Sequence, residues 1–252
     1  SPKGVRPRPC YSEAILTTPY SGWCQVGCSF CYVNMGKRGY KSVLLPTVNE
    51  DYSTVFDKQL EKMMISGAVY ISSYTEAFQD LESTYHITER LSQVVTKHGL
   101  PIFYLSRRIP PEWAKDVLIS NPYSYMQWSI NTSNPDDLRR LSPGTFSMAE
   151  LLTAVEEYSK AGIYTSFQIK PIIPEVTTLE EIIQLVRLLA QAGGRHVIFK
   201  VVEESAPNRE VLLKRLRSSH LEGVDRFEKL FTQYLGHQYY VRQDLRIEWF
   251  KV

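Results

Sequence analysis

Short apolar runs alternate with helical patterns along most of this chain, and this alternation constrains its fold more than any other feature. Each run is bounded by glycine, proline or polar residues, as buried parallel strands usually are. A strand followed by a helix and a parallel neighbour forms a right-handed βαβ unit. We therefore expect strands over residues 14–18, 68–72, 101–105, 125–130, 165–171 and 196–202.

Helical patterns lie between these runs, and two of them carry clear start signals. Ser147 and Thr178 each stand three residues before a glutamate, which is the spacing of a capping box. Six βα units without a composition break predict an α/β fold, an incomplete (β/α)6 barrel over residues 1–205. The expected helices span residues 51–65, 88–97, 112–119, 147–160 and 178–192.

The segment 206–252 departs from this alternation and is predicted to be a C-terminal extension that packs on the barrel. Residues 211–217 and 224–235 have the pattern of amphipathic helices, and 239–241 with 245–250 alternate like a small hairpin. The basic side chains of the first helix are expected on its outer face: Lys214, Arg215 and Arg217.

Composition excludes some classes of protein. A net charge of +2 is too mild to indicate nucleic-acid binding by itself. No apolar run is long enough to span a bilayer. The first ten residues, SPKGVRPRPC, lack the apolar core of a signal peptide, so a cytoplasmic location is expected. Three of the four cysteines form one tight group, which in a reducing compartment indicates metal binding rather than disulfides.

That group is Cys24, Cys28 and Cys31, with the spacing C-x3-C-x2-C. Three thiolates can hold three irons of a [4Fe–4S] cluster, whereas most such proteins supply four cysteines. The remaining cysteine, Cys10, has no spacing relation to the three, so the fourth iron is expected to stay open for a ligand. A zinc site with an outside fourth ligand is the alternative, and it leaves a non-enzymatic metal protein open.

The cysteines follow the first expected strand, and functional residues of parallel barrels collect at the carboxyl ends of the strands. The same ends carry a polar ring that would surround the cluster. Its members are residues 72–76 and 106–108, Ser129, Asn131, Thr132, Gln168, Lys170, Lys200, Glu203 and Glu204.

A C-x3-C-x2-C run after the first strand of such a barrel resembles the radical S-adenosylmethionine (SAM) superfamily, from about residue 16 to about residue 202. The resemblance implies two cofactors, a [4Fe–4S] cluster and SAM, with the amino and carboxylate groups of SAM on the open iron. It also implies reductive cleavage of SAM to a 5′-deoxyadenosyl radical, and an external one-electron donor of the flavodoxin or ferredoxin type.

Three further stretches resemble the spore photoproduct lyase branch, which is often described as DNA-repair-photolyase-like. They are TPYSGW before the cysteines, TEAFQDLE at residues 75–82, and the set LSPGT (141–145), AGI (161–163) and PIIPE (171–175).

The chain also departs from that branch. Trp23 is inserted before the first cysteine, Ser142 and Leu151 stand where the branch has a glutamate and its arginine companion, and residues 104–106 replace its T-K-S. No cysteine follows Cys31, although the lyase uses one as a hydrogen donor. We therefore favour a small-molecule or peptide substrate in a biosynthetic pathway, and keep DNA or RNA lesion repair or nucleotide modification as the alternative.

The resemblance also implies roles for single residues. Phe30 and Tyr32 would pack near the adenine of SAM, Ser73, Thr75 and Glu76 would bind its ammonium, and Ser129 and Asn131 its ribose or carboxylate. Lys170 would hold that carboxylate or an anionic substrate. Plain alternatives are core aromatics, a helix N-cap and a solvated lysine. Residues 37–41, Arg107 and Arg108 form basic loops that could hold phosphates, and Tyr40, Tyr74 and Tyr104 are possible hydrogen donors.

Overall fold

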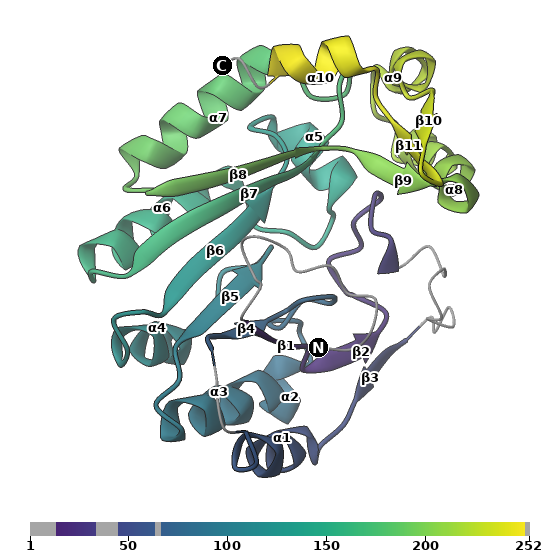
Figure 1. The fold of residues 1–252 in the computed structure, drawn as a ribbon. Helices are drawn as coiled ribbons and strands as arrows, with labels where there is room; N and C mark the ends of the chain where they lie inside the picture. The colour runs from purple at the N-terminus through teal and green to yellow at the C-terminus, as the bar shows by residue number, and fades with distance from the viewer. Residues whose placement is uncertain (1–13, 34–44, 64–66, 250–252) are drawn as a thin grey trace.

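A six-stranded parallel sheet forms the centre of the molecule (Figure 1). The computed structural model describes residues 14–33, 45–63 and 67–249. Neighbouring strands follow one another in chain order and every pair is parallel, which confirms the predicted partial barrel. The strands are β1 (Ile15–Thr17), β4 (Val69–Ile71), β5 (Ile102–Ser106), β6 (Tyr125–Ile130), β7 (Tyr164–Ile172) and β8 (His196–Val201).

The helices between these strands cover the outer face of the sheet (Figure 1). The capping boxes predicted at Ser147 and Thr178 are both present. The first helix ends at Leu60, earlier than expected, and two short helices, α2 and α5, were not predicted. The bounds are α1 (Tyr52–Leu60), α2 (Glu82–Tyr85), α3 (Ile87–Lys97), α4 (Glu112–Ile119), α5 (Pro135–Leu141), α6 (Met148–Lys160) and α7 (Leu179–Gln191).

Alternation along the strands separates the core from the functional face. Trp128 on β6 is fully buried and packs edge-on against Tyr158 of α6, with ring centroids 5.1 Å apart. It also stacks on Phe167, its partner on β7. Because successive side chains of a strand point to opposite faces, the next residues, Ser129 and Gln168, face the concave side of the sheet. The cavity described below opens there.

Two small antiparallel sheets flank the main sheet. Strands β2 (Tyr20–Gly22) and β3 (Pro46–Val48) pair beside the cysteines, so a short strand separates β1 from the cysteine run. At the other end β9 (Glu203–Ser205) pairs with β11 (Gln238–Tyr240), which pairs with β10 (Gln233–Leu235). The division of the chain at residue 205 stays a prediction, although β9 joins the last residues before it to the extension.

The C-terminal extension contains helices α8 (Ala206–Ser218), α9 (Val224–Leu230) and α10 (Gln243–Trp249). The predicted hairpin of residues 239–241 with 245–250 is wrong, because the second run is helical. The hairpin closes earlier, at Gly236 and His237, whose positive φ angles of 56° and 69° suit a tight two-residue turn. No helix in the described ranges is long and apolar enough to cross a membrane.

Candidate active site

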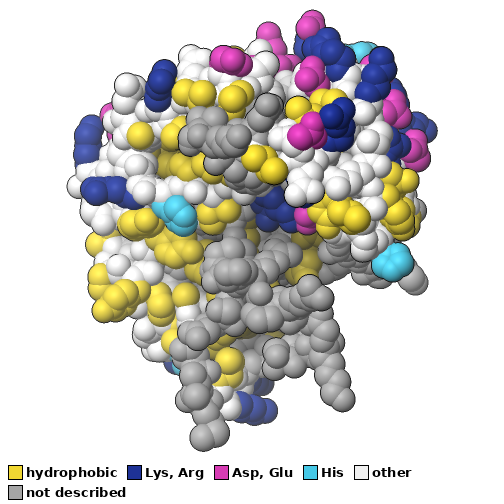
Figure 2. Space-filling view, turned by 45° about the horizontal axis from the view of Figure 1, so that its top comes forward, with side chains coloured by type: hydrophobic (Ala, Val, Ile, Leu, Met, Phe, Trp, Pro, Cys, Tyr) yellow, Lys and Arg dark blue, Asp and Glu magenta, His cyan; other side chains and the backbone are white. Residues whose placement is uncertain are grey.

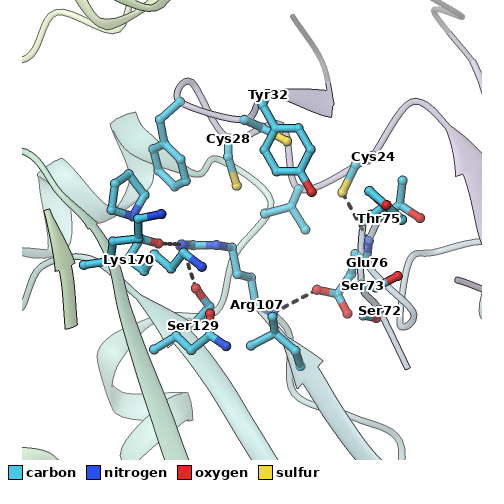
Figure 3. A pocket seen from close by; sticks show the side chains of 18 of the residues that line it. Cys24, Cys28, Tyr32, Ser72, Ser73, Thr75, Glu76, Arg107, Ser129 and Lys170 are labelled. Atoms are coloured by element: carbon cyan, nitrogen blue, oxygen red, sulfur yellow. Dashed lines mark hydrogen bonds between the residues drawn. The ribbon is translucent and has the colours of Figure 1, made fainter. Parts of the chain in front are cut away.

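A cavity of about 300 Å³ opens at the carboxyl ends of the parallel strands (Figure 3). All three clustered cysteines line it. Cys24 and Cys28 are buried, and Cys31 is half-buried. The opposite wall comes from the ends of β4 to β8 and from the extension, which contributes Leu212 and Gln238. The structure therefore brings the cysteine run and most of the predicted polar ring around one space, whereas Arg108, Asn131 and Thr132 do not line it.

The loop after α5 holds the cysteine loop from one side. Gly144 N donates to Val26 O at 2.9 Å, and Ser29 N donates to Leu141 O at 2.8 Å. The Ser142 hydroxyl donates to the Cys28 sulfur at 3.2 Å. These contacts explain why the LSPGT stretch accompanies the cysteines, although more than a hundred residues separate the two.

The stretch TEAFQDLE holds the same loop from the other side. Gln79 Oε1 accepts from Gln25 N at 2.8 Å, and Gln25 Oε1 accepts from Asp80 N at 2.9 Å. The Glu76 N–H points at the Cys24 sulfur, 3.5 Å away. Two distant motifs thus fix the cysteine loop through reciprocal hydrogen bonds.

Glu76 carries a buried carboxylate on the cavity wall. Its oxygens accept from Phe78 N at 3.1 Å, from the Ser106 hydroxyl at 2.8 Å and from Arg107 N at 2.8 Å. Burial nevertheless raises the pKa of this carboxyl above its ordinary value. A carboxylate offers about four lone-pair positions. The three bonds therefore leave one position for a ligand, and a cationic ligand would offset the cost of burying the charge.

Arg107, at the end of β5, lies inside the cavity wall rather than in a solvated basic loop. Only 8% of its surface is exposed. Its guanidinium donates to Ser129 Oγ at 2.8 Å and to Lys170 O at 3.1 Å, and it lies 4.9 Å from the Phe30 ring centroid. Among the described residues no carboxylate stands within ion-pair distance of this guanidinium, so a buried positive charge faces the cavity.

Most residues with predicted roles line this one cavity, and their roles stay predictions. The cavity is lined by Phe30, Tyr32, Ser73, Thr75, Glu76, Ser129 and Lys170. Thr75 donates to Tyr20 O, and the Ser73 hydroxyl pairs with that of Thr18 at 2.8 Å, so both also fix local structure. Asn131 is different, because it is fully buried behind the wall and donates to Pro171 O at 2.7 Å.

Other predicted residues are placed elsewhere. Arg108 pairs with the Asp80 carboxylate instead of standing free for a phosphate. Tyr104 is fully buried and donates to Ser92 on α3 at 2.7 Å, so it does not reach the rim. Tyr74 lines the cavity and is 46% exposed. Cys10, Tyr40 and the basic run 37–41 lie outside the described residues.

The buried polar groups fit a bound cofactor pair. The Ser72 hydroxyl lines the cavity, is buried and has no hydrogen-bond partner in the described structure. Burial, and next the Glu76 carboxylate, raise the pKa of the Cys24 thiol to about 12. A bound iron would reverse this shift, because metal ions deprotonate coordinating thiols.

No three His, Cys, Asp or Glu side chains of the described ranges are placed to hold one metal ion. The ligands of a [4Fe–4S] cluster do not have to meet at one metal ion, because each thiolate binds a different iron.

Comparison with known proteins gives a sequence relative. No protein-family model matches this chain. A curated protein of Pseudomonas phage M6, described as a radical SAM Nα-GlyT isomerase, is 42% identical over 248 residues. The alignment covers 98% of this chain and 52% of the relative, so the chain spans about half the length of that protein.

Solved structures share the fold at low sequence identity. Spore photoproduct lyase, complexed with a dinucleoside spore photoproduct, has a TM-score of 0.62 at 19% identity, covering 92% of this chain and 69% of the lyase. SuiB of Streptococcus suis has a TM-score of 0.56 at 12% identity, covering 77% of this chain and 40% of SuiB. At these identities the similarities describe the fold alone.

Proposed function

We propose that this chain is a radical SAM enzyme, and that Cys24, Cys28 and Cys31 hold a [4Fe–4S] cluster that cleaves SAM reductively. One observation carries the proposal: the three cysteines line a single cavity beside the buried groups Glu76 and Arg107. The three cysteines would hold the cluster, which when bound and reduced would supply the electron for cleavage of SAM and so the radical chemistry at the substrate.

The two buried charges give the amino-acid part of SAM one orientation. The remaining lone pair of Glu76 would accept from the ammonium, with Ser73 and Thr75 on the same side of the cavity. The Arg107 guanidinium, held by Ser129, would bind the carboxylate. This assignment moves the carboxylate site from Lys170 to Arg107, which the sequence suggested only as a phosphate ligand in a basic loop.

Aromatic side chains would then cover the rest of the ligand. Phe30 stacks on Arg107, and Tyr32 lines the cavity and lies between Cys24 and Cys28 in the view of Figure 3. Both come from the cysteine loop itself, so the cluster and the adenine would be placed by one segment. Asn131 would act indirectly, through its hydrogen bond to Pro171 on the wall.

For the substrate we propose an isomerisation, with a small molecule or peptide as the reactant. The relative's description, an isomerase of Nα-GlyT, supports the reaction type and not the chemical class of the reactant. In an isomerisation a hydrogen atom is removed and one is returned, so the reaction needs no net oxidant. The initiating electron would come from an external donor of the flavodoxin or ferredoxin type.

The described surface does not favour a nucleic-acid substrate. Arg107 is internal, and Arg108 is neutralised by Asp80. On the face shown in Figure 2, Lys and Arg side chains are interspersed with Asp and Glu in the upper part. The exposed Arg217, for example, pairs with Asp225 and Glu228. Phosphate binding depends instead on clustered positive charge.

Anaerobic reconstitution tests the cluster and the cleavage together. The protein is loaded with iron and sulfide, reduced, and incubated with SAM, and 5′-deoxyadenosine is quantified by chromatography. We expect cleavage by the wild type and by Cys10→Ser, but none by Cys28→Ser, which removes one ligand. A wild type that assembles a competent cluster but releases no 5′-deoxyadenosine would refute the proposal.

A second incubation, with Nα-GlyT added, tests the isomerisation. We expect a product with the mass of the substrate and a different retention time, formed only when SAM and reductant are both present. A product of different mass would show that the chain starts the same radical chemistry but completes another reaction.

A further inference from the structure

Arg215 on helix α8 of the C-terminal extension forms hydrogen bonds to the cysteine loop. The Arg215 guanidinium donates to Cys28 O at 3.2 Å and to Cys31 O at 3.5 Å. Both acceptors are backbone carbonyls of residues proposed as cluster ligands. The sequence placed Arg215 on the outer face of the helix, and this expectation is wrong.

The position of Arg215 on the helix explains its direction. Leu212 lines the cavity and is almost fully buried, and Arg215 follows it by three residues. Residues three apart in a helix share a face, so Arg215 lies on the cavity side. Lys214 is exposed, and Arg217 points outward to Asp225 and Glu228. Of these three basic residues, therefore, only Arg215 faces the cysteine loop.

The charge of Arg215 is not cancelled by a neighbour. No carboxylate in the described part of the chain lies within ion-pair distance of its guanidinium, whereas Arg209, earlier on the same helix, pairs with Glu210. Carbonyl oxygens accept its hydrogen bonds but carry no net charge. The guanidinium therefore adds a positive charge directly behind two of the three cysteines.

We propose that Arg215 is a positioning residue that holds the cysteine loop in shape and stabilises the reduced form of the cluster. This inference rests on the proposed function, because it requires a cluster on these cysteines. Reduction adds one negative charge, and net charge with hydrogen bonding around the cysteines sets the potential of such clusters. A cation behind the loop favours the reduced form, so its loss should lower the reduction potential.

Three variants test this assignment. Arg215→Met removes both the charge and the donors. Arg215→Lys keeps the charge but loses the planar fork that reaches two carbonyls. Arg217→Met is the matched control, because it removes the same charge from the outer face of the same helix. Each reconstituted protein is examined without SAM, by redox titration followed by electron paramagnetic resonance and by the rate of iron loss to a chelator.

For Arg215→Met we expect a tenfold shift of the reduction equilibrium towards the oxidised form, about 59 mV for one electron. Iron loss should be roughly tenfold faster, since charge-assisted hydrogen bonds to the loop are gone. Arg215→Lys should lose iron faster while its potential stays near that of the wild type. Arg217→Met should match the wild type in both measurements.

An unchanged potential and chelation rate in Arg215→Met would overturn the proposal, and so would an equal shift in Arg217→Met. Where Arg215→Met does not fold, as judged by circular dichroism, Arg215→Lys decides: wild-type iron retention in that variant refutes the positioning role. A wild type that binds no cluster at all refutes the proposed function instead, so the two failures are distinguishable.

Discussion

The approach of the loop at residues 141–145 to the cysteine loop makes Gly144 a position that tolerates no side chain. A Cβ at Gly144 would lie 2.5 Å from Gln25 O and 2.8 Å from Val26 Cα. Both are backbone atoms of the cysteine loop, so no side-chain rotation relieves the overlap. Gly144→Ala must therefore push the two loops apart and weaken the Gly144 N to Val26 O hydrogen bond of 2.9 Å.

The cost of this substitution follows from two contributions. Forcing an extra methyl group into a packed site costs about 1–3 kcal/mol. A weakened buried hydrogen bond adds about 0.5–1.5 kcal/mol. The total of about 1.5–4.5 kcal/mol corresponds to a fall in Tm of about 3–18 °C for a chain of this size. Because the displaced segment carries Cys24 and Cys28, the loss of iron should exceed what global destabilisation alone explains.

Gly162→Ala provides the control for stability alone. Gly162 has a φ of +79°, and nothing lies within 4 Å of its missing Cβ. The alanine there would cost roughly 1–2 kcal/mol through backbone strain, far from the cysteines. Melting curves and iron content per chain are measured for both variants. A Gly144→Ala protein with wild-type Tm and iron content would refute the steric reasoning, and equal iron loss in both variants would refute its local character.

Two further predictions concern charged groups. Arg107→Lys should raise the KM for SAM in 5′-deoxyadenosine formation by on the order of tenfold with little change in kcat, because lysine cannot reproduce the guanidinium fork; an unchanged KM would remove Arg107 from the ligand site. Asp57 accepts from Lys97 at 2.9 Å and from His98 at 2.6 Å, and these partners lower its pKa below the ordinary 3.8. The stabilisation is therefore present above that ordinary pKa and is lost as pH falls through the folded-state value. Tm should thus fall less steeply in acid for Asp57→Asn than for the wild type, and parallel curves would contradict this.

The order of the strands was predictable because each strand is marked in the sequence by a short apolar run and by the turn residues at its two ends. Six apolar runs, each closed by turn residues, specify parallel units, and the boxes at Ser147 and Thr178 mark two helix starts. The extension was harder, because a short alternation of apolar residues does not distinguish a strand from a helix. Ile247 lies in such an alternation, yet it is 48% exposed on α10.

The candidate site was predictable where a motif marks it and not where burial decides. The cysteines and Glu76 belong to recognisable stretches. Arg107 and Arg108 are adjacent arginines in the sequence, yet Arg107 is buried and Arg108 forms an ion pair at the surface. One signal was available in the T-K-S that the branch has after the third strand. Residues 104–106 of this chain contain no lysine at the matching place, but a basic residue, Arg107, follows them directly. For Arg215 the signal was its three-residue spacing from Leu212.

Two departures from the spore photoproduct lyase branch form one change. That branch has a glutamate before the proline of this loop and an arginine on the next helix; here the positions hold Ser142 and Leu151, and Leu151 is fully buried in the core. A buried charge left without its partner is costly, so the two members of such a pair are best lost together.

Ser142 instead contacts an arginine from another element, Arg107. Its hydroxyl donates to the Cys28 sulfur at 3.2 Å and lies 3.4 Å from Nη1 of Arg107. The arginine that contacts the loop at residues 141–145 thus comes from the end of β5, whereas in the branch it comes from the helix that corresponds to α6. A serine does not neutralise a guanidinium, whereas a glutamate would. The replacement therefore leaves the positive charge of Arg107 available to a carboxylate in the cavity, which is the property that the proposed SAM site requires.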